Sequence, residues 1–291
     1  MNNLKGIFPA LLTPFDRQDK INEPVLRQIV KLGITQKADG FYVGGSTAET
    51  FLLTIDERKL ILEIVIDELH GKLPVIAHIG CISTSQAIDL AKHAQSCGVD
   101  AISSVAPFYY QFSFDEIKNY YLDIMDSCSL PMIIYYIPGF SGINLNSEQI
   151  GELISDKRVA GFKFTSSDYY TMERIKNLRS DLIIYNGFDE MFLAGLCMGA
   201  DGGIGSTYNF MADRFVRILE LYKKGDMSAA LDEQKKANNI IQALIKVGVI
   251  PGEKALLELM GIPAGVCRKP FKQISPEERE YLFKIWNENN N

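Results

Sequence analysis

The chain has 291 residues, of which 47% are hydrophobic and 23% charged, a composition that excludes a disordered chain and is typical of a globular protein. Lys and Arg number 30 against 36 for Asp and Glu, so the net charge is -6 and nucleic acid is not an expected partner. No apolar run approaches the roughly 18 residues of a membrane span, and no signal-peptide core opens the sequence, so we expect a cytoplasmic protein without a membrane partner.

Short apolar, β-branched segments alternate with longer segments of helical periodicity through the first two-thirds of the chain. This alternation is the signature of repeated βα units. Eight strands are predicted, at residues 6–12, 40–43, 74–79, 101–105, 132–136, 159–164, 182–186 and 202–205.

Four helix starts between these strands carry capping-box chemistry, in which an N-cap side chain and a Glu or Gln three residues later satisfy each other's backbone donors. The pairs are Thr54 with Glu57, Ser83 with Gln86, Ser113 with Glu116, and Asn146 with Gln149. The segment 56–69 also has apolar residues at helical spacing, as expected of a helix packed by one face. They are Leu60, Ile61, Ile64, Val65 and Leu69.

Eight strand and helix units predict an α/β fold, a (β/α)8 TIM barrel. A doubly wound sheet fits less well, because no strand is followed by the Gly-x-Gly-x-x-Gly turn of dinucleotide-binding folds. Beyond about residue 212 the strand signals stop, and helices are predicted at 227–247, 252–260 and 276–287. We therefore expect the barrel core at residues 1–211. The last barrel helix and a C-terminal helical extension would follow at 212–291, in the same structural unit.

Cysteine and histidine patterns point neither to a disulfide framework nor to a metal site. Five cysteines are spread along the chain without a Cys-x-x-Cys pair, and no two histidines form His-x-x-x-His. We interpret the cysteines as reduced packing residues: Cys81, Cys97, Cys128, Cys197 and Cys267. The sequence therefore predicts neither a metal nor another cofactor.

In such barrels the active site lies at the carboxyl ends of the strands, so the residues after each strand are the candidates. The second strand ends in the turn 44–47, Gly-Gly-Ser-Thr, whose amides and hydroxyls can hold a carboxylate; a simple tight turn is the alternative. Asp189 and Glu190 follow the seventh strand, and Ser206 follows the eighth. These groups suit a polyhydroxy substrate, although the two acids could instead favour the start of the next helix.

Lys163, near the end of the sixth strand, stands out without any family comparison. An ammonium inside an apolar barrel is costly to desolvate, and burial favours the free amine, which can attack a ketone and form a Schiff base. The alternatives are a lysine that reaches solvent or pairs with a carboxylate. Tyr135 ends the neighbouring fifth strand, so both side chains are expected at the same end of the barrel.

Six motifs occur in order over nearly the whole chain. They are Gly44-Gly45-Ser46-Thr47, Pro107-Phe108-Tyr109-Tyr110, Tyr135-x-Ile137-Pro138, Gly161-x-Lys163-x-Thr165, Gly187-Phe188-Asp189-Glu190 and Gly203-x-Gly205-Ser206. In order and spacing they resemble the N-acetylneuraminate lyase and dihydrodipicolinate synthase superfamily of class I lyases and aldolases. The resemblance implies a pyruvate-dependent enzyme and a homotetramer built from two dimers.

The same resemblance implies a role for each matching residue. Lys163 would form the Schiff base, and Tyr135 would be the phenol that relays protons. Contacts to the substrate are also implied: Ser46 and Thr47 to the pyruvoyl carboxylate, and Thr165, Gly187, Asp189, Glu190 and Ser206 to the rest of a sugar acid. Tyr109 matches a tyrosine that reaches the neighbouring subunit's site. Ala48 stands where the family more often has glycine, which implies less backbone freedom at that turn.

One stretch separates the two branches of the superfamily. The synthases resemble one another in carrying an arginine shortly after Tyr-x-x-Pro, where it holds a second carboxylate, and this chain reads Gly-Phe-Ser-Gly at 139–142. The expected reaction is therefore the reversible aldol cleavage of N-acetylneuraminate (sialic acid) to pyruvate and N-acetylmannosamine. Alternatives are dihydrodipicolinate synthase, a 2-keto-3-deoxy sugar acid aldolase, a metal-dependent aldolase, or a catalytically silent barrel.

Overall fold

The structure, a computed structural model, describes residues 4–290. Eight parallel strands form one sheet in the order β1-β8-β7-β6-β5-β4-β3-β2, and a bridge between Ala10 and Tyr42 joins its two edges. The strands are β1 (Gly6–Pro9), β2 (Phe41–Val43), β3 (Val75–His78), β4 (Ala101–Val105), β5 (Met132–Tyr136), β6 (Val159–Phe164), β7 (Ile183–Asn186) and β8 (Gly202–Gly205). The predicted (β/α)8 TIM barrel is confirmed.

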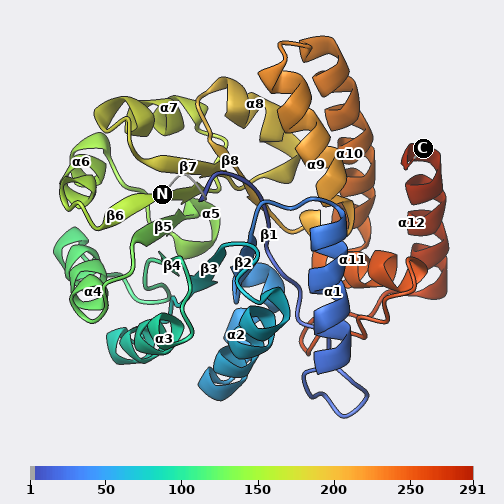
Figure 1. Cartoon of the computed structure of the whole chain (residues 1–291), viewed down its shortest axis with the longest axis horizontal. Coiled ribbons are helices and arrows are strands. Elements are labelled where there is room, and N and C mark those ends of the chain that lie inside the picture. Colours follow the sequence, from blue (N-terminus) through green and yellow to red (C-terminus); the bar gives the residue numbers. More distant parts are fainter. Residues whose placement is uncertain (1–3, 291) are drawn as a thin grey trace.

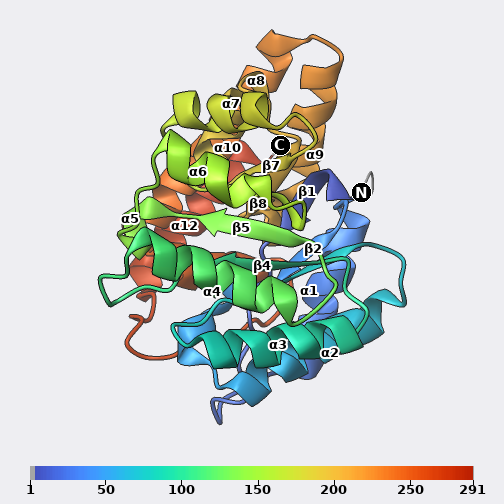
Figure 2. The ribbon, with the colours of Figure 1, turned by 90° about the vertical axis from the view of Figure 1, so that its left-hand side faces the viewer.

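Helices surround the strands in a ring (Figure 1). They are α1 (Glu23–Thr35), α2 (Ile55–Leu69), α3 (Thr84–Ser96), α4 (Phe114–Asp126), α6 (Ser147–Ser155), α7 (Tyr169–Leu178), α8 (Phe192–Cys197) and α9 (Tyr208–Lys223). Short helical turns follow three of the strands: η2 (Ser46–Ala48), η3 (Thr50–Leu52), α5 (Pro138–Ser141) and η4 (Asp189–Met191). Figure 2 shows β5 running towards α5, and the described chain begins at the opposite end of the barrel.

The predicted strands match the structure at both ends for β4, β5, β6 and β8. The first predicted strand ran to residue 12, but β1 ends at Pro9, and the next residue, Ala10, forms an isolated bridge to Tyr42 of β2. Capping boxes form at Thr54, Ser113 and Asn146. The capping box predicted at Ser83 is wrong, because its hydroxyl bonds instead to the Ser85 hydroxyl at 2.9 Å.

Two packing predictions also need correction. Leu60 was assigned to the buried face of α2, but its side chain is 44% exposed while Ile61 and Ile64 are buried. Cys197 is exposed on α8, so it is not a packing residue, whereas Cys81 and Cys267 are buried free thiols. Both errors have the same cause, since periodicity and residue type do not fix which flank of a helix its neighbours cover.

The C-terminal part consists of α10 (Met227–Val247), α11 (Val249–Leu259) and α12 (Pro276–Asn289). Figure 1 shows α10 beside α9 on one side of the barrel, with α12 farther out. The helix α9 is kinked at Met211, where the backbone angles are not helical. Across residues 4–290, no helix combines the length and the apolarity that a membrane span requires.

A buried ion pair ties α11 to the turn after β2. Lys254 Nζ lies 2.6 Å from Glu49 Oε1, and the two side chains are 1% and 0% exposed. The other carboxylate oxygen of Glu49 accepts a bond from the Arg268 backbone N–H at 2.7 Å. At this turn Glu49, with φ 59°, adopts the left-handed conformation, whereas Ala48 lies in η2. The alanine at position 48 therefore occupies a conformation open to any L-residue.

We expect Glu49→Gln to destabilise the protein by about 3–5 kcal/mol, because it leaves the Lys254 ammonium buried without a counter-charge. Denaturant unfolding measures this free energy. The matched control is Asp232→Asn, which removes one partner of an exposed ion pair with Lys235 and should change stability by less than about 1 kcal/mol. Equal effects of the two substitutions would contradict the prediction.

Candidate active site

A cavity of about 300 Å³ lies at the carboxyl ends of strands β2, β5, β6, β7 and β8. We call it the lysine cavity. Its lining contains every site residue predicted from the sequence: Ser46, Thr47, Tyr135, Lys163, Thr165, Gly187, Asp189, Glu190 and Ser206. Helices α10 and α11 close one side with apolar residues, among them Leu244 and Ile250. The extension therefore forms part of the cavity wall, which sequence reasoning had left unassigned.

Lys163 and Tyr135 face each other inside the barrel. They are register partners on β6 and β5, and Lys163 Nζ lies 4.1 Å from the centre of the Tyr135 ring. The Lys163 side chain is only 4% exposed, and it forms no ion pair with any residue in the described range 4–290. Neither alternative considered for this lysine, a path to solvent or a carboxylate partner, is therefore realised.

A bulge in β6 turns Lys163 inward. Met132 pairs with Val159 but the next residue of β5 pairs with Gly161, so β6 carries one extra residue. Before the bulge Ala160 faces the barrel interior, and after it Phe162 packs outside against the helices. Strict alternation from Ala160 would have turned Lys163 away from the interior. The irregularity is thus what aims the amine into the cavity.

Tyr42 and His78 were missed from the sequence, yet both lie beside the reactive pair. Lys163 Nζ is 4.5 Å from the Tyr42 ring centre, and the His78 ring is 5.9 Å from that of Tyr135. Burial, with the charge of Arg58, holds the pKa of His78 well below its usual value. The neutral ring donates from Nδ1 to the Gly44 carbonyl at 2.9 Å. Only its position at the end of an apolar strand could have drawn attention to His78.

The Asp189 carboxyl is buried and points across the cavity wall towards the start of α9. One oxygen accepts bonds from the backbone N–H and the hydroxyl of Thr207, at 2.9 and 2.7 Å. The other has no hydrogen-bond partner among residues 4–290. A Cβ at Gly205 would lie 1.9 Å from that oxygen, so glycine is required there. Asp189 therefore belongs to the cavity and does not serve as a simple cap for α8.

Helix α10 holds the backbone of the acidic turn η4. Gln234 donates to the Asp189 carbonyl at 3.0 Å, and Asn238 donates to the Glu190 carbonyl at 3.1 Å. The Leu193 N–H in turn donates to the Gln234 side chain at 3.0 Å. These bonds fix both acids from the C-terminal extension, so the extension positions cavity residues as well as covering them.

Thr165 and Gly187 come into close contact on the next two strand ends. A Cβ at Gly187 would lie 1.9 Å from Thr165 Oγ1, so only glycine fits. That hydroxyl oxygen is buried without a hydrogen-bond partner in the described part of the chain. Thr165 Oγ1 and the second oxygen of Asp189 are therefore two polar atoms beside the cavity that remain able to form a hydrogen bond with a ligand.

Burial raises the pKa of Asp189 to about 6, despite the Thr207 bonds that lower it. Because an unfolded aspartate titrates near 3.9, the folded state binds more protons between these values, and its stability decreases as pH rises from about 4 through about 6. We therefore expect the free energy of unfolding of Asp189→Asn, relative to that of wild type, to increase by about 3 kcal/mol between about pH 4 and pH 6. Thermal unfolding at several pH values measures this change. The exposed-site variant Asp232→Asn should show no such gain; a pH-independent difference for Asp189→Asn would contradict the assignment.

Tyr109 lies outside the lysine cavity of its own chain. Its side chain is 84% exposed, and its φ of 80° is left-handed, which is rare for an aromatic residue. Its ring contacts that of Tyr110, with ring centres 5.0 Å apart. A role in the site would therefore need a second subunit, as the resemblance implies.

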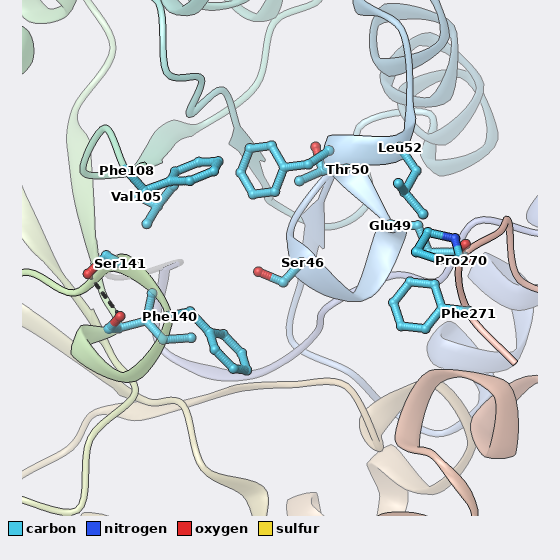
Figure 3. Close-up of a pocket in the computed structure, with 12 residues that line it drawn as sticks. Ser46, Glu49, Thr50, Leu52, Val105, Phe108, Phe140, Ser141, Pro270 and Phe271 are labelled. Atoms are coloured by element: carbon cyan, nitrogen blue, oxygen red, sulfur yellow. Dashed lines mark hydrogen bonds between the residues drawn. The ribbon is translucent and has the colours of Figure 1, made fainter. Parts of the chain in front are cut away.

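A second, largely apolar cavity of about 370 Å³ adjoins the first (Figure 3). We call it the phenylalanine cavity, since Phe51, Phe108, Phe140 and Phe271 line it. Ser46 lines both cavities, and in Figure 3 its hydroxyl points away from Phe271 into the space between Phe108 and Phe140. The two spaces thus meet at the turn predicted to hold a carboxylate.

Known proteins resemble this chain over nearly its whole length. The sequence profile of the Dihydrodipicolinate synthetase family matches residues 3–289. The chain belongs to this family. Within it, N-acetylneuraminate lyase from Escherichia coli is 46% identical over 285 residues, covering 97% of this chain and 95% of that protein.

Solved structures of other members superpose on nearly the whole chain. CdNal from Clostridium difficile, determined in complex with mannosamine, is 42% identical with a TM-score of 0.96, covering 98% of this chain and 99% of that one. N-acetylneuraminate lyase from Fusobacterium nucleatum, complexed with pyruvate, is 39% identical with a TM-score of 0.95, covering 99% and 98%. The family fold thus extends through the C-terminal helices.

Proposed function

We propose that this protein is a class I lyase that cleaves N-acetylneuraminate reversibly to pyruvate and N-acetylmannosamine through a Schiff base on Lys163. The observation that carries the proposal is the pairing of Lys163 with Tyr135 in a cavity whose other end holds Asp189, Glu190 and Ser206. An amine beside a phenol suits imine chemistry, and the polar end suits a polyhydroxylated chain. The 46% identical lyase supports the same reaction.

In the proposed reaction the Lys163 amine attacks the C2 ketone of the open-chain sugar acid, and loss of water gives an iminium ion. The iminium accepts the electron pair of the C3–C4 bond as that bond breaks, and Tyr135 takes the proton of the C4 hydroxyl. N-acetylmannosamine leaves, and the remaining enamine is protonated at C3. Water then hydrolyses the imine, which releases pyruvate and restores the amine.

In this proposal the two ends of the cavity bind different parts of the substrate. Ser46 and Thr47, after β2, would hold the carboxylate beside the ketone. At the other end Asp189, Glu190 and Ser206 would bond the sugar hydroxyls, together with Thr165 and Gly187 from the intervening strand ends. Among the described residues that line the lysine cavity, Lys163 is the only cationic side chain. A substrate with a second carboxylate would therefore find no guanidinium group there to bind it. This favours a sugar over the second substrate of the synthases.

The test is to incubate the purified protein with N-acetylneuraminate and to quantify pyruvate and N-acetylmannosamine, with and without a chelator. Equimolar release that the chelator does not change is expected. Dihydrodipicolinate synthase substrates and 2-keto-3-deoxy sugar acids serve as competing substrates. Faster turnover of one of these, or loss of activity with the chelator, would overturn the proposal.

We also propose that the protein works in the cytoplasm as a homotetramer. The exposed aromatic residues Tyr109, Tyr110 and Phe140 support an association surface near the loops after β4 and β5. Light scattering coupled to size-exclusion chromatography is expected to give four times the chain mass, and a monomer mass would contradict the assembly.

A further inference from the structure

His78, the last residue of β3, is a buried polar side chain to which the proposed reaction gives no role. It is 4% exposed at the end of an otherwise apolar strand, where a polar group without partners would be costly. Both ring nitrogens have partners, however. Nδ1 lies 2.9 Å from the Gly44 carbonyl oxygen after β2, and Nε2 lies 3.4 Å from the backbone nitrogen of Val105 at the end of β4. The imidazole therefore bridges the carboxyl ends of the two strands that flank its own.

These two partners fix the position of the ring proton. A carbonyl oxygen only accepts, so Nδ1 carries the hydrogen, and a backbone N–H only donates, so Nε2 supplies a lone pair. The ring also fits closely, since a Cβ at Gly80 would lie 2.9 Å from Nε2. On the other side, Arg58 of α2 donates to the His78 backbone carbonyl at 3.0 Å. The structure thus holds one neutral form of the imidazole in one orientation.

The turn 44–47 has few other tertiary contacts that could hold its backbone. Within residues 4–290, His78 is the only side chain that hydrogen-bonds to the backbone of this turn. Gly44, with φ 77°, is left-handed and is followed by a second glycine, so the turn is intrinsically free to adopt other conformations. Just beyond the turn, the Thr13 hydroxyl donates to the Ala48 carbonyl at 2.9 Å. His78 therefore anchors the beginning of the turn, and Thr13 anchors the chain after it.

The anchored Gly44 carbonyl sets the direction of the next amide. In a planar trans peptide the carbonyl and the following N–H point in opposite directions, so the Gly45 N–H points away from His78. Nothing in the described part of the chain accepts a bond from the backbone N–H groups of Gly45, Ser46 or Thr47. The last two of these residues also line the lysine cavity. The turn therefore has three amide donors that remain able to bind a ligand.

We propose that His78 is a positioning residue for the substrate carboxylate: its bond to the Gly44 carbonyl holds the turn 44–47 in the conformation that binds this group. The inference rests on the proposed function, in which the turn receives the pyruvoyl carboxylate, and it adds the residue that orients the turn. His78 does not itself line the lysine cavity, so its effect reaches the substrate through the turn. Binding of a substrate without a carboxylate should therefore not depend on His78.

Aldol synthesis separates the two substrates, because pyruvate carries the carboxylate and N-acetylmannosamine does not. His78→Phe keeps a planar ring but cannot donate to Gly44. We expect it to raise KM for pyruvate about 10-fold, as befits one hydrogen bond, and to leave KM for N-acetylmannosamine within about 3-fold of wild type. In His78→Asn the amide nitrogen lies as many bonds from the backbone as Nδ1, so this variant should restore KM for pyruvate to within about 3-fold.

Tyr121→Phe is the matched control for the loss of a buried hydrogen bond. The Tyr121 hydroxyl donates to the Ser104 carbonyl at 3.3 Å, outside the lysine cavity. Its removal should leave both KM values within about 3-fold of wild type. Borohydride trapping measures the same effect without the sugar. The pyruvate concentration that gives half of the maximal adduct on Lys163 should rise about 10-fold in His78→Phe and return close to wild type in His78→Asn.

Equal rises in both KM values, an unchanged KM for pyruvate in His78→Phe, or no restoration by His78→Asn would each overturn the inference. If His78→Phe does not fold, His78→Gln replaces it, because its amide reaches the Nε2 position and leaves Gly44 without a donor. Failure of both to fold would establish a purely structural histidine instead. Wild-type protein that forms the adduct without cleaving N-acetylneuraminate would overturn only the proposed sugar, since the adduct series still decides the role of His78. Wild-type protein without an adduct would overturn both proposals.

Discussion

Replacement of Lys163 by alanine is expected to reduce N-acetylneuraminate cleavage by at least about 10⁴-fold, the scale typical of losing a covalent nucleophile. The amine supplies the only route by which the proposed mechanism turns a ketone into an electron sink. Steady-state kinetics measures this loss. Incubation with pyruvate and borohydride, followed by mass spectrometry, should show one adduct on the wild-type chain and none on Lys163→Ala.

Peptide mapping provides an internal control for the adduct. Lys254 is buried as deeply as Lys163, but its amine donates to Glu49 and lies outside the lysine cavity. A pyruvate adduct should therefore map to Lys163 and leave Lys254 unmodified. Residual cleavage by Lys163→Ala at close to the wild-type rate, or an adduct elsewhere, would eliminate the Schiff-base mechanism.

The second large effect is expected for Tyr135→Phe, which removes only the phenolic oxygen from the register partner of Lys163. Proton transfer by a positioned group contributes about 10²–10⁴-fold to catalysis, so kcat should decrease by that factor while KM changes little. The pyruvate adduct on Lys163 should still form, since the amine is untouched. Kinetics and adduct formation together distinguish a lost proton relay from a damaged site.

Tyr136→Phe is the matched control for this substitution. Tyr136 is the next residue on β5, but its ring stacks on Phe164 outside the barrel, with ring centres 5.2 Å apart. Loss of its hydroxyl should leave kcat within about 3-fold of wild type, because the group has no access to the cavity. Equal losses in Tyr135→Phe and Tyr136→Phe would show that β5 is sensitive to any substitution, and would remove the assignment of Tyr135.

Much of the candidate site is predictable from order along the chain. In a parallel barrel every strand ends at the same face, so residues after β2, β5, β6, β7 and β8 must meet there. That rule, with the six motifs, was enough to select nine of the residues that line the lysine cavity. The positions of Tyr42 and His78 beside the reactive pair were not predicted. In the sequence alone, an aromatic residue or a histidine in an apolar strand cannot be distinguished from a core residue.

The sequence alone determined the barrel, because local signals were strong and consistent: eight apolar runs, capping boxes, and motifs at strand ends. Tertiary structure decided features that depend on distant partners. The bulge at Ala160 arises from pairing between β5 and β6, and it alone turns Lys163 inward. Contacts from α10 fix the backbone of η4, and Lys254 on α11 pairs with Glu49 in the turn after β2. Such contacts leave no local pattern, because each depends on how far-apart segments pack together.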